Sequence, residues 1–323
     1  VAVNSIARWN GTGWSALGSG MNVSVYSVTA LPNGDLIAGG QFTTAGGVGA
    51  SRIARWNGTD WSALSSGMDG SVIAITTLAG GDMVVGGQFT TVGDIAANHV
   101  ARWNGAAWSA LGSGMNSFVS SLVTLPNGDL VAGGDFTIAG GAAANRVARW
   151  DGATWSALGP GMNQAVYALS VLPNGDLIAG GYFTAAGGVA ANRIARWDGT
   201  NWLPLGPGMD ATVDALAVLP NGDLVAGGQF TSAGGVAVNS IARWDGAAWS
   251  ALGSGRNSYV YALTTQPNGD LVAGGPFTGA IARWNGTTWL AVGAGINSGP
   301  VRSLTTLSNG DVVAGGDFTT AGG

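Results

Sequence analysis

Short runs of apolar residues recur along the whole chain, four to each unit, with turn-forming residues between them. Residues 166–205 are one such unit. The run VYALSVL is apolar on both alternating faces, which is typical of a strand covered on two sides. PNGD follows it, and Asn-Gly is the strongest short signal for a hairpin. The unit therefore predicts four antiparallel strands, named A to D in chain order, at Val166–Leu172, Asp176–Thr184, Arg193–Trp197 and Trp202–Leu205.

The dipeptide Arg-Trp marks the period of this unit. The first six copies are spaced by 47 residues, and the last step is 40. Seven units of four short strands predict an all-β fold, a seven-bladed β-propeller, and we expect residues 1–323 to form one such domain. No segment sustains a 3.6-residue apolar period without Gly, so no helix is expected. The seven copies are Arg8-Trp9, Arg55-Trp56, Arg102-Trp103, Arg149-Trp150, Arg196-Trp197, Arg243-Trp244 and Arg283-Trp284.

The two ends of the chain complete one unit. The chain ends in DFTTAGG and begins with VAVNSIARW, and joined tail to head these segments recreate the pattern of residues 229–241. We therefore expect one blade to contain strands C and D from the N-terminus and strands A and B from the C-terminus. Such a closure removes free sheet edges, which are sites of aggregation in other proteins.

The residues of the repeat resemble a known family. Strand B carries Gly-Gly, as at Gly180-Gly181, strand C ends in Trp, and a second Trp follows five residues later. This pattern resembles kelch-type propellers, and LPNGDLIAGG followed by IARWNGT is similar to kelch-related repeats of bacterial surface and secreted proteins. The resemblance covers essentially the whole chain. It implies the fold and an extracellular or cell-surface location, but little about activity, because propellers host enzymes, lectins and scaffolds alike.

Composition narrows the possible functions. All twelve cations are Arg, all seventeen anions are Asp, and the net charge is −5, which does not suit a nucleic-acid partner. Cys is absent and His99 is the one histidine, so we expect no disulfide, no thiolate or His-cluster metal site and no cofactor. The chain contains no apolar run of about 18 residues, so we expect no membrane insertion. We expect a monomer.

Every repeat carries one Asp after the A–B turn and one Arg near the end of strand C. Strands B and C are expected to be antiparallel neighbours, which places the start of B beside the end of C. We therefore predict a buried structural ion pair in each blade, with a ring of ligand sites as the alternative. Loss of Asp311 is expected to open the closing blade. The predicted pairs are Asp35–Arg55, Asp82–Arg102, Asp129–Arg149, Asp176–Arg196, Asp223–Arg243, Asp270–Arg283 and Asp311–Arg8.

Two further recurring features have structural interpretations. Of the fourteen Trp residues, seven end strand C and seven begin strand D. Trp can stack on sugars, but a residue present in every repeat is most simply filling the same gap between blades. Three segments, at Asn10, Asn57 and Asn285, match glycosylation sequons, yet Asn-Gly is also expected there for a tight C–D turn.

The repeats differ most at the mouth of strand A. Strand A is expected to line the central channel, so this position rings the channel mouth and could bind a small polar ligand or a peptide. Drift at exposed positions is the alternative. We name Tyr26, Tyr167, Asp214, Tyr261 and Arg302 as candidate ligand-binding residues. The full set is Tyr26, Ile73, Ser120, Tyr167, Asp214, Tyr261 and Arg302.

Three other irregularities lie near the same face. The residue after Gly-Gly varies, and the set is Gln41, Gln88, Asp135, Tyr182, Gln229, Pro276 and Asp317. The B–C loop of the sixth repeat is shortened to FTGAI, which could admit a ligand or a neighbouring protein or could be a harmless deletion. His99 is expected at the surface, where other repeats carry Arg or Ser.

An enzyme is the least supported class. A kelch-like copper-radical oxidase would need Tyr, Cys and His ligands, and a sialidase-like site would need an Arg cluster rather than the single Arg302. We therefore expect a non-enzymatic scaffold that presents a rigid ring for protein or small polar ligand binding at the channel face. The alternatives are lectin-like carbohydrate binding, and a passive spacer or symmetric engineered propeller without a ligand.

Overall fold

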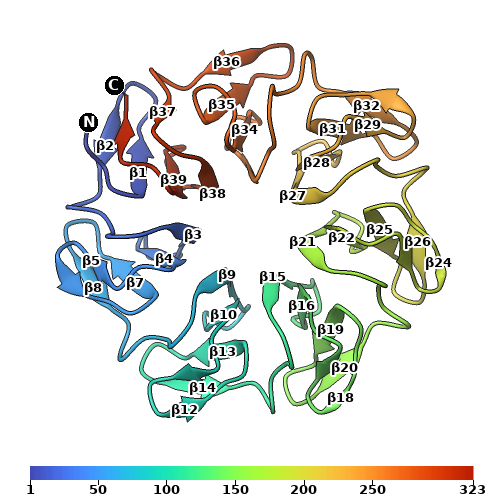
Figure 1. The fold of residues 1–323 in the computed structure, drawn as a ribbon, viewed down its shortest axis with the longest axis horizontal. Coiled ribbons are helices and arrows are strands. Elements are labelled where there is room, and N and C mark those ends of the chain that lie inside the picture. The colour runs from blue at the N-terminus through green and yellow to red at the C-terminus, as the bar shows by residue number, and fades with distance from the viewer. Residues whose placement is uncertain (323) are drawn as a thin grey trace.

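A computed structural model describes residues 1–322 as seven four-stranded antiparallel sheets arranged around a central axis (Figure 1). In each sheet strand A lies nearest the axis and strand D lies outermost. The predicted seven-bladed all-β propeller is confirmed. No helix in this described part of the chain has the length and apolarity needed to cross a membrane.

The observed strands are one to four residues shorter than the sequence predicts, because the turns at both ends take the flanking residues. The A strands are β3 (Val25–Ala30), β9 (Val72–Thr77), β15 (Val119–Thr124), β21 (Val166–Val171), β27 (Val213–Val218), β33 (Ala262–Thr265) and β38 (Val301–Thr306). The B strands are β4 (Leu36–Gly40), β10 (Met83–Gly87), β16 (Leu130–Gly134), β22 (Leu177–Gly181), β28 (Leu224–Gly228), β34 (Leu271–Gly274) and β39 (Val312–Gly316).

The outer strands begin and end at the same positions in every repeat. The C strands are β7 (Ile53–Trp56), β13 (Val100–Trp103), β19 (Val147–Trp150), β25 (Ile194–Trp197), β31 (Ile241–Trp244), β35 (Ile281–Trp284) and β1 (Ile6–Trp9). The D strands are β8 (Trp61–Ala63), β14 (Trp108–Ala110), β20 (Trp155–Ala157), β26 (Trp202–Pro204), β32 (Trp249–Ala251), β36 (Trp289–Ala291) and β2 (Trp14–Ala16). We number the blades 1 to 7 from β3 to β38.

The B–C loops carry additional short strands that the sequence pattern did not predict. In blades 1 to 5 each loop folds into a two-stranded hairpin, and in blade 7 the short strand β40 (Thr320–Ala321) pairs with β37 (Ile296–Asn297). Within residues 1–322, blade 6 has no such hairpin. The five hairpins are β5 (Thr44–Ala45) with β6 (Val48–Gly49), β11 (Thr91–Val92) with β12 (Ile95–Ala96), β17 (Ile138–Ala139) with β18 (Ala142–Ala143), β23 (Ala185–Ala186) with β24 (Val189–Ala190), and β29 (Ser232–Ala233) with β30 (Val236–Ala237).

Blade 7 closes the ring with strands from both ends of the chain, as predicted. Its order is β2-β1-β39-β38, and Ile6 of β1 pairs with Gly315 of β39. The N-terminal ammonium of Val1 donates a hydrogen bond of 2.7 Å to the carbonyl oxygen of Ala321. The N- and C-termini accordingly lie side by side in Figure 1.

The Gly-Gly pairs of the B strands create the space into which the next blade packs. A Cβ atom built on Gly180 would lie 2.5 Å from Cγ1 of Val213, the first residue of the A strand in the following blade. A Cβ atom on Gly181 would overlap the carbonyl oxygen of Ala165 in its own blade. The first glycine therefore admits a neighbouring side chain, and the second admits a backbone.

Trp residues provide a second contact between blades. The indole Nε1–H of Trp61, which begins strand D of blade 1, donates a hydrogen bond of 2.8 Å to the carbonyl oxygen of Leu17 in blade 7. The corresponding bond recurs in all seven blades. Each donor also packs against the Trp that ends strand C, as for Trp56 and Trp61, whose ring centroids are 5.3 Å apart. These contacts give the Trp residues a packing role.

The structure places each predicted Asp beside its predicted Arg, but the pairs are less buried than expected. The Arg side chains are 39–48% exposed and the Asp side chains 9–19%. The expectation of buried Arg groups is corrected: the Arg side chains line solvent-open grooves between neighbouring blades, as Arg196 does between blades 4 and 5 and Arg243 does between blades 5 and 6. One carboxylate oxygen of Asp311 accepts a hydrogen bond of 2.6 Å from Nε of Arg8 and a second of 3.1 Å from Nδ2 of Asn309.

We expect Asp311→Ala to lower the free energy of unfolding by about 1–3 kcal/mol, because the well-shielded carboxylate holds both a guanidinium and a turn amide. Asp223→Ala is the matched control, since it removes the same contacts from a blade whose four strands are consecutive in the chain. The closing blade has no covalent link between β39 and β1, so Asp311→Ala should cost more. Equal chemical denaturation midpoints for Asp311→Ala and the unsubstituted protein would contradict this.

Candidate functional site

The variable residue at the mouth of each A strand occupies a β-bulge. In blade 5, Val213 pairs with Gly228 and Ala215 pairs with Gly227, which leaves Asp214 as an extra residue without a partner. The same shift occurs in every other blade except blade 6, where Tyr261 directly precedes β33 and donates its N–H to the carbonyl oxygen of Gly274. A bulge re-aims a side chain out of the regular alternation. The bulged residues are Tyr26, Ile73, Ser120, Tyr167, Asp214 and Arg302.

The five candidate residues lie on five consecutive blades. Going around the ring they are Tyr167, Asp214, Tyr261, Arg302 and Tyr26, whereas blades 2 and 3 carry Ile73 and Ser120. The structure therefore gathers the aromatic and charged side chains into one arc of the channel mouth. We call these five residues the mouth arc.

Arg302 connects the two tyrosines on either side of it. Its guanidinium carbon lies 5.6 Å from the ring centroid of Tyr26 and 5.8 Å from that of Tyr261. Its Nε donates a hydrogen bond of 2.5 Å to Asp317, the residue after Gly-Gly in the same blade. The charge of Arg302 is thus balanced within its own blade, and both neighbouring rings lie within cation–π range.

Asp214 carries a charge that no Arg balances. Nε2 of Gln229 donates a hydrogen bond of 3.1 Å to its carboxylate, and no Arg among residues 1–322 forms an ion pair with it. Burial raises the pKa of Asp214 to about 6, because the amide hydrogen bond offsets only part of the lost hydration. Burial and then the charge of Asp214 raise the pKa of Tyr167 and of Tyr261, so both phenols lie in its field.

The two variable positions of one blade contact each other. Besides Asp214 with Gln229 and Arg302 with Asp317, the hydroxyl of Tyr26 donates a hydrogen bond of 3.2 Å to Oε1 of Gln41. In each pair the partners are fifteen residues apart and lie at adjoining ends of strands A and B. In these three blades the residue after Gly-Gly therefore supports the mouth residue of its own blade.

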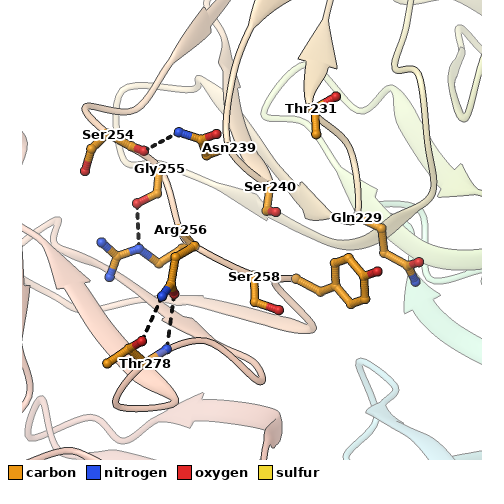
Figure 2. Close-up of a pocket in the computed structure, with 11 residues that line it drawn as sticks. Gln229, Thr231, Asn239, Ser240, Ser254, Gly255, Arg256, Ser258 and Thr278 are labelled. Carbon is orange, nitrogen blue, oxygen red and sulfur yellow. Dashed lines mark hydrogen bonds between the residues drawn. The ribbon is translucent and has the colours of Figure 1, made fainter.

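A pocket of about 790 Å³ opens between blades 5 and 6, next to the mouth arc (Figure 2). We call it the notch. Gln229 lines it on one side and Arg256 on the other. Its position matches a smaller pocket of about 430 Å³ between blades 7 and 1, where Met21 stands in place of Arg256. The shortened B–C loop of blade 6 lacks the hairpin that lines the matching pocket in blade 1 through Thr44 and Gly47, and the notch is the larger of the two pockets.

Arg256 was not among the site residues predicted from the sequence. The signal was present, because the corresponding residues of the other repeats are all apolar. They are Met21, Met68, Met115, Met162, Met209 and Ile296. One Arg in a column of buried apolar residues indicates that its surroundings differ. The consequence of the shortened loop for these surroundings could not be read without the structure.

His99 is half-buried rather than fully at the surface. Its backbone has a φ of +68°, and the residues at the same place in the other repeats share a positive φ. Nδ1 lies 3.1 Å from the carbonyl oxygen of Gly87, and burial lowers the pKa of the imidazole. Within residues 1–322 no group of three or more His or Asp side chains is arranged to hold a metal ion.

Comparisons with known proteins agree with the fold. Residues 31–62 and 172–197 match a family model described as a domain of unknown function (DUF5122), beta-propeller. No curated protein matches the chain.

Three similar structures are a WD40 propeller, an extracellular domain and a lyase. The WD40 beta propeller domain of Doa1 is 15% identical, with a TM-score of 0.65 over 96% of this chain and 94% of that one. The extracellular domain of BT4673 from B. thetaiotaomicron is 11% identical, with a TM-score of 0.64 over 92% of this chain and 38% of that one. Catalytically inactive virginiamycin B lyase from Staphylococcus aureus with quinupristin is 14% identical, with a TM-score of 0.60 over 93% of this chain and 96% of that one. At these identities the likeness shows the fold alone.

We expect Asp214→Asn to stabilise the protein at about pH 7.5, by up to about 3 kcal/mol if the pKa difference from the ordinary value of 3.8 is fully expressed. The folded-state pKa lies above the unfolded-state value, so the ionised carboxylate opposes folding. The destabilisation by the ionised carboxylate reaches its full size above about pH 6 and disappears below about pH 3.8. Unfolding curves across this pH range should therefore converge at low pH. If Asp214→Asn gives no gain in stability at neutral pH, or a gain that does not change with pH, the raised pKa of Asp214 is contradicted.

Proposed function

We propose that this chain is a non-enzymatic binding module whose mouth arc holds a small polar ligand, or a protein segment, through a positively charged amine. The observation that carries the proposal is the half-buried carboxylate of Asp214, which lacks a cationic partner in the described residues and lies between Tyr167 and Tyr261. A half-buried carboxylate is stabilised by an incoming cation more than an exposed one is. Tyrosine faces add attraction for an ammonium group.

The rest of the arc supports an amine over an anion. Arg302 already donates to Asp317 and lies between two tyrosine rings, so its charge is balanced before any ligand arrives. Asp214 is the unbalanced group, and the hydrogen bond from Gln229 leaves acceptor capacity on its carboxylate. An ammonium group that enters the channel mouth would therefore pair with Asp214 and pack beside the neighbouring rings.

Other parts of the proposal rest on the repeat itself. The resemblance of the repeats to kelch-related sequences supports an extracellular or cell-surface location. The shortage of residues suited to acid–base catalysis supports a binding role without catalysis. The free sheet edges of the ring are the short D strands, which supports a monomer, and the negative net charge argues against a nucleic-acid partner. Lectin-like binding of a neutral sugar and a passive spacer remain the alternatives that the experiment separates.

Peptide and glycan arrays at about pH 7 are the test, with lysine-containing peptides and amino sugars compared with their N-acetylated forms. We expect binding to amine-bearing probes, with a loss of about tenfold or more in Asp214→Asn and a clear loss in Tyr261→Ala. Ser120→Ala changes the same ring position outside the arc and should bind normally. Affinity should fall as the pH is lowered through about 6, because Asp214 becomes neutral.

Two results would contradict the proposal. Equal binding of free and N-acetylated probes by the unsubstituted protein and by Asp214→Asn would favour a lectin-like site elsewhere on the face. Absence of binding to every array member, by a protein that melts cooperatively at high temperature, would favour the passive spacer.

A further inference from the structure

The notch contains a cation that is partly removed from water and has no carboxylate partner. Nine of the twelve Arg side chains form ion pairs, but Arg256 forms none within residues 1–322. Its Nε donates a hydrogen bond of 2.7 Å to the carbonyl oxygen of Gly255, and burial lowers the pKa of its guanidinium. A desolvated cation without a counter-ion costs stability, so its presence at a pocket favours an anionic ligand.

Aromatic rings hold this guanidinium in place. Its central carbon lies 4.4 Å from the ring centroid of Trp289 and 5.3 Å from that of Phe277. In blade 1 a hairpin glycine covers the corresponding Trp61, since a Cβ atom on Gly46 would lie 3.0 Å from Cβ of Trp61. Blade 6 lacks that hairpin, and Arg256 lies over Trp289 instead. Stacking leaves the terminal N–H groups along the guanidinium edge, and a planar carboxylate accepts two such donors.

The remainder of the notch is rich in hydroxyl and amide groups. In Figure 2, Ser240 and Ser258 lie between Arg256 and Gln229, and their side chains form no hydrogen bond to the other lining residues drawn. Tyr259 also lines the notch; the residue is 43% exposed, and its ring lies 6.3 Å from that of Tyr261. An exposed ring beside small hydroxyl groups suits the face and the hydroxyl groups of a sugar.

The surrounding charges argue for one carboxylate rather than many. Asp210 borders the notch through Thr231, whose hydroxyl donates to its carboxylate at 2.6 Å, and Asp214 borders it through Gln229. The net charge of the chain is −5. A polyanion would meet these acids, whereas a single carboxylate can reach Arg256 alone.

We propose that the notch binds an acidic sugar, a ligand with one carboxylate on a hydroxyl-rich body, with Arg256 as the carboxylate-binding residue. The guanidinium N–H groups donate to the carboxylate at the outer end, and the serines and Tyr259 contact the sugar ring toward the channel. This site is separate from the mouth arc, which selects for a positive charge. Neither proposal depends on the other.

The test is titration of the whole chain with D-glucuronate, followed by calorimetry or protein NMR, with glucose, acetate and N-acetylglycine as comparison probes that carry no amine. Arg256→Met introduces the residue that five other repeats carry, so the variant should fold, and thermal melting checks this. Arg52→Met removes one cation without a carboxylate partner from the B–C loop of blade 1, and is the matched control. Arg256→Lys keeps the charge but loses the two-donor edge.

We expect glucuronate to bind the unsubstituted protein and Arg52→Met equally, and Arg256→Met about tenfold or more weakly. Arg256→Lys should also bind more weakly, and glucose and acetate should bind the unsubstituted protein more weakly than glucuronate. The proposal is overturned if a folded Arg256→Met binds glucuronate normally, or if no binding occurs up to the solubility of the probe. Acetate or N-acetylglycine binding as tightly as glucuronate would overturn the assignment to a sugar.

Discussion

The contact on which this ring depends is a valine placed where a glycine has no side chain. A valine at the start of each A strand packs against the first glycine of Gly-Gly in the preceding blade, as Val213 does against Gly180, and a Cβ atom on that glycine would overlap it. In blade 6 this valine is Val260, which lies two residues before β33. The same contact joins Gly315 to Val25, across the junction that follows the closing blade. Since every junction uses it, this valine–glycine contact determines how closely neighbouring blades approach each other.

This contact also positions the candidate site. The anchored valine directly precedes the bulged residue, so the side chain at the channel mouth varies while the backbone that holds it does not. The scaffold can therefore carry Asp214 in one blade and Arg302 in another at little cost to the packing. The notch follows the same logic, because the shortened loop of blade 6 lies outside the contact, and Gly274 still receives Val301. Stability resides in the repeated residues, and the chemistry resides in those that differ between repeats.

The fold and the Asp–Arg pairs were predictable from the sequence for a physical reason. A 47-residue period that contains four short apolar runs admits few folds, and antiparallel pairing of strands B and C was enough to predict partners as distant as Asp311 and Arg8. The bulge at Asp214 was not predictable, because a single extra residue does not alter the apolar alternation visibly. The exposure of the Arg side chains depends on the grooves between neighbouring blades, which strand pairing alone does not describe. The role of Arg256 depends on the B–C loop of blade 6, which lacks the hairpin of blades 1 to 5. This loop is distant from Arg256 in the sequence, and the pocket between them is visible only in the folded structure.

The most direct test of the account is a carbon-13 NMR titration of the Asp214 carboxyl group in the intact protein, assigned by its loss in Asp214→Asn. The ring places that carboxylate, half-buried and without a cation, between two tyrosines, and the account predicts a pKa of about 6. Addition of an amine ligand should lower this value. A pKa near 3.8 in the free protein would mean that Asp214 is an ordinary solvated acid and that the channel mouth is not built to hold a charge.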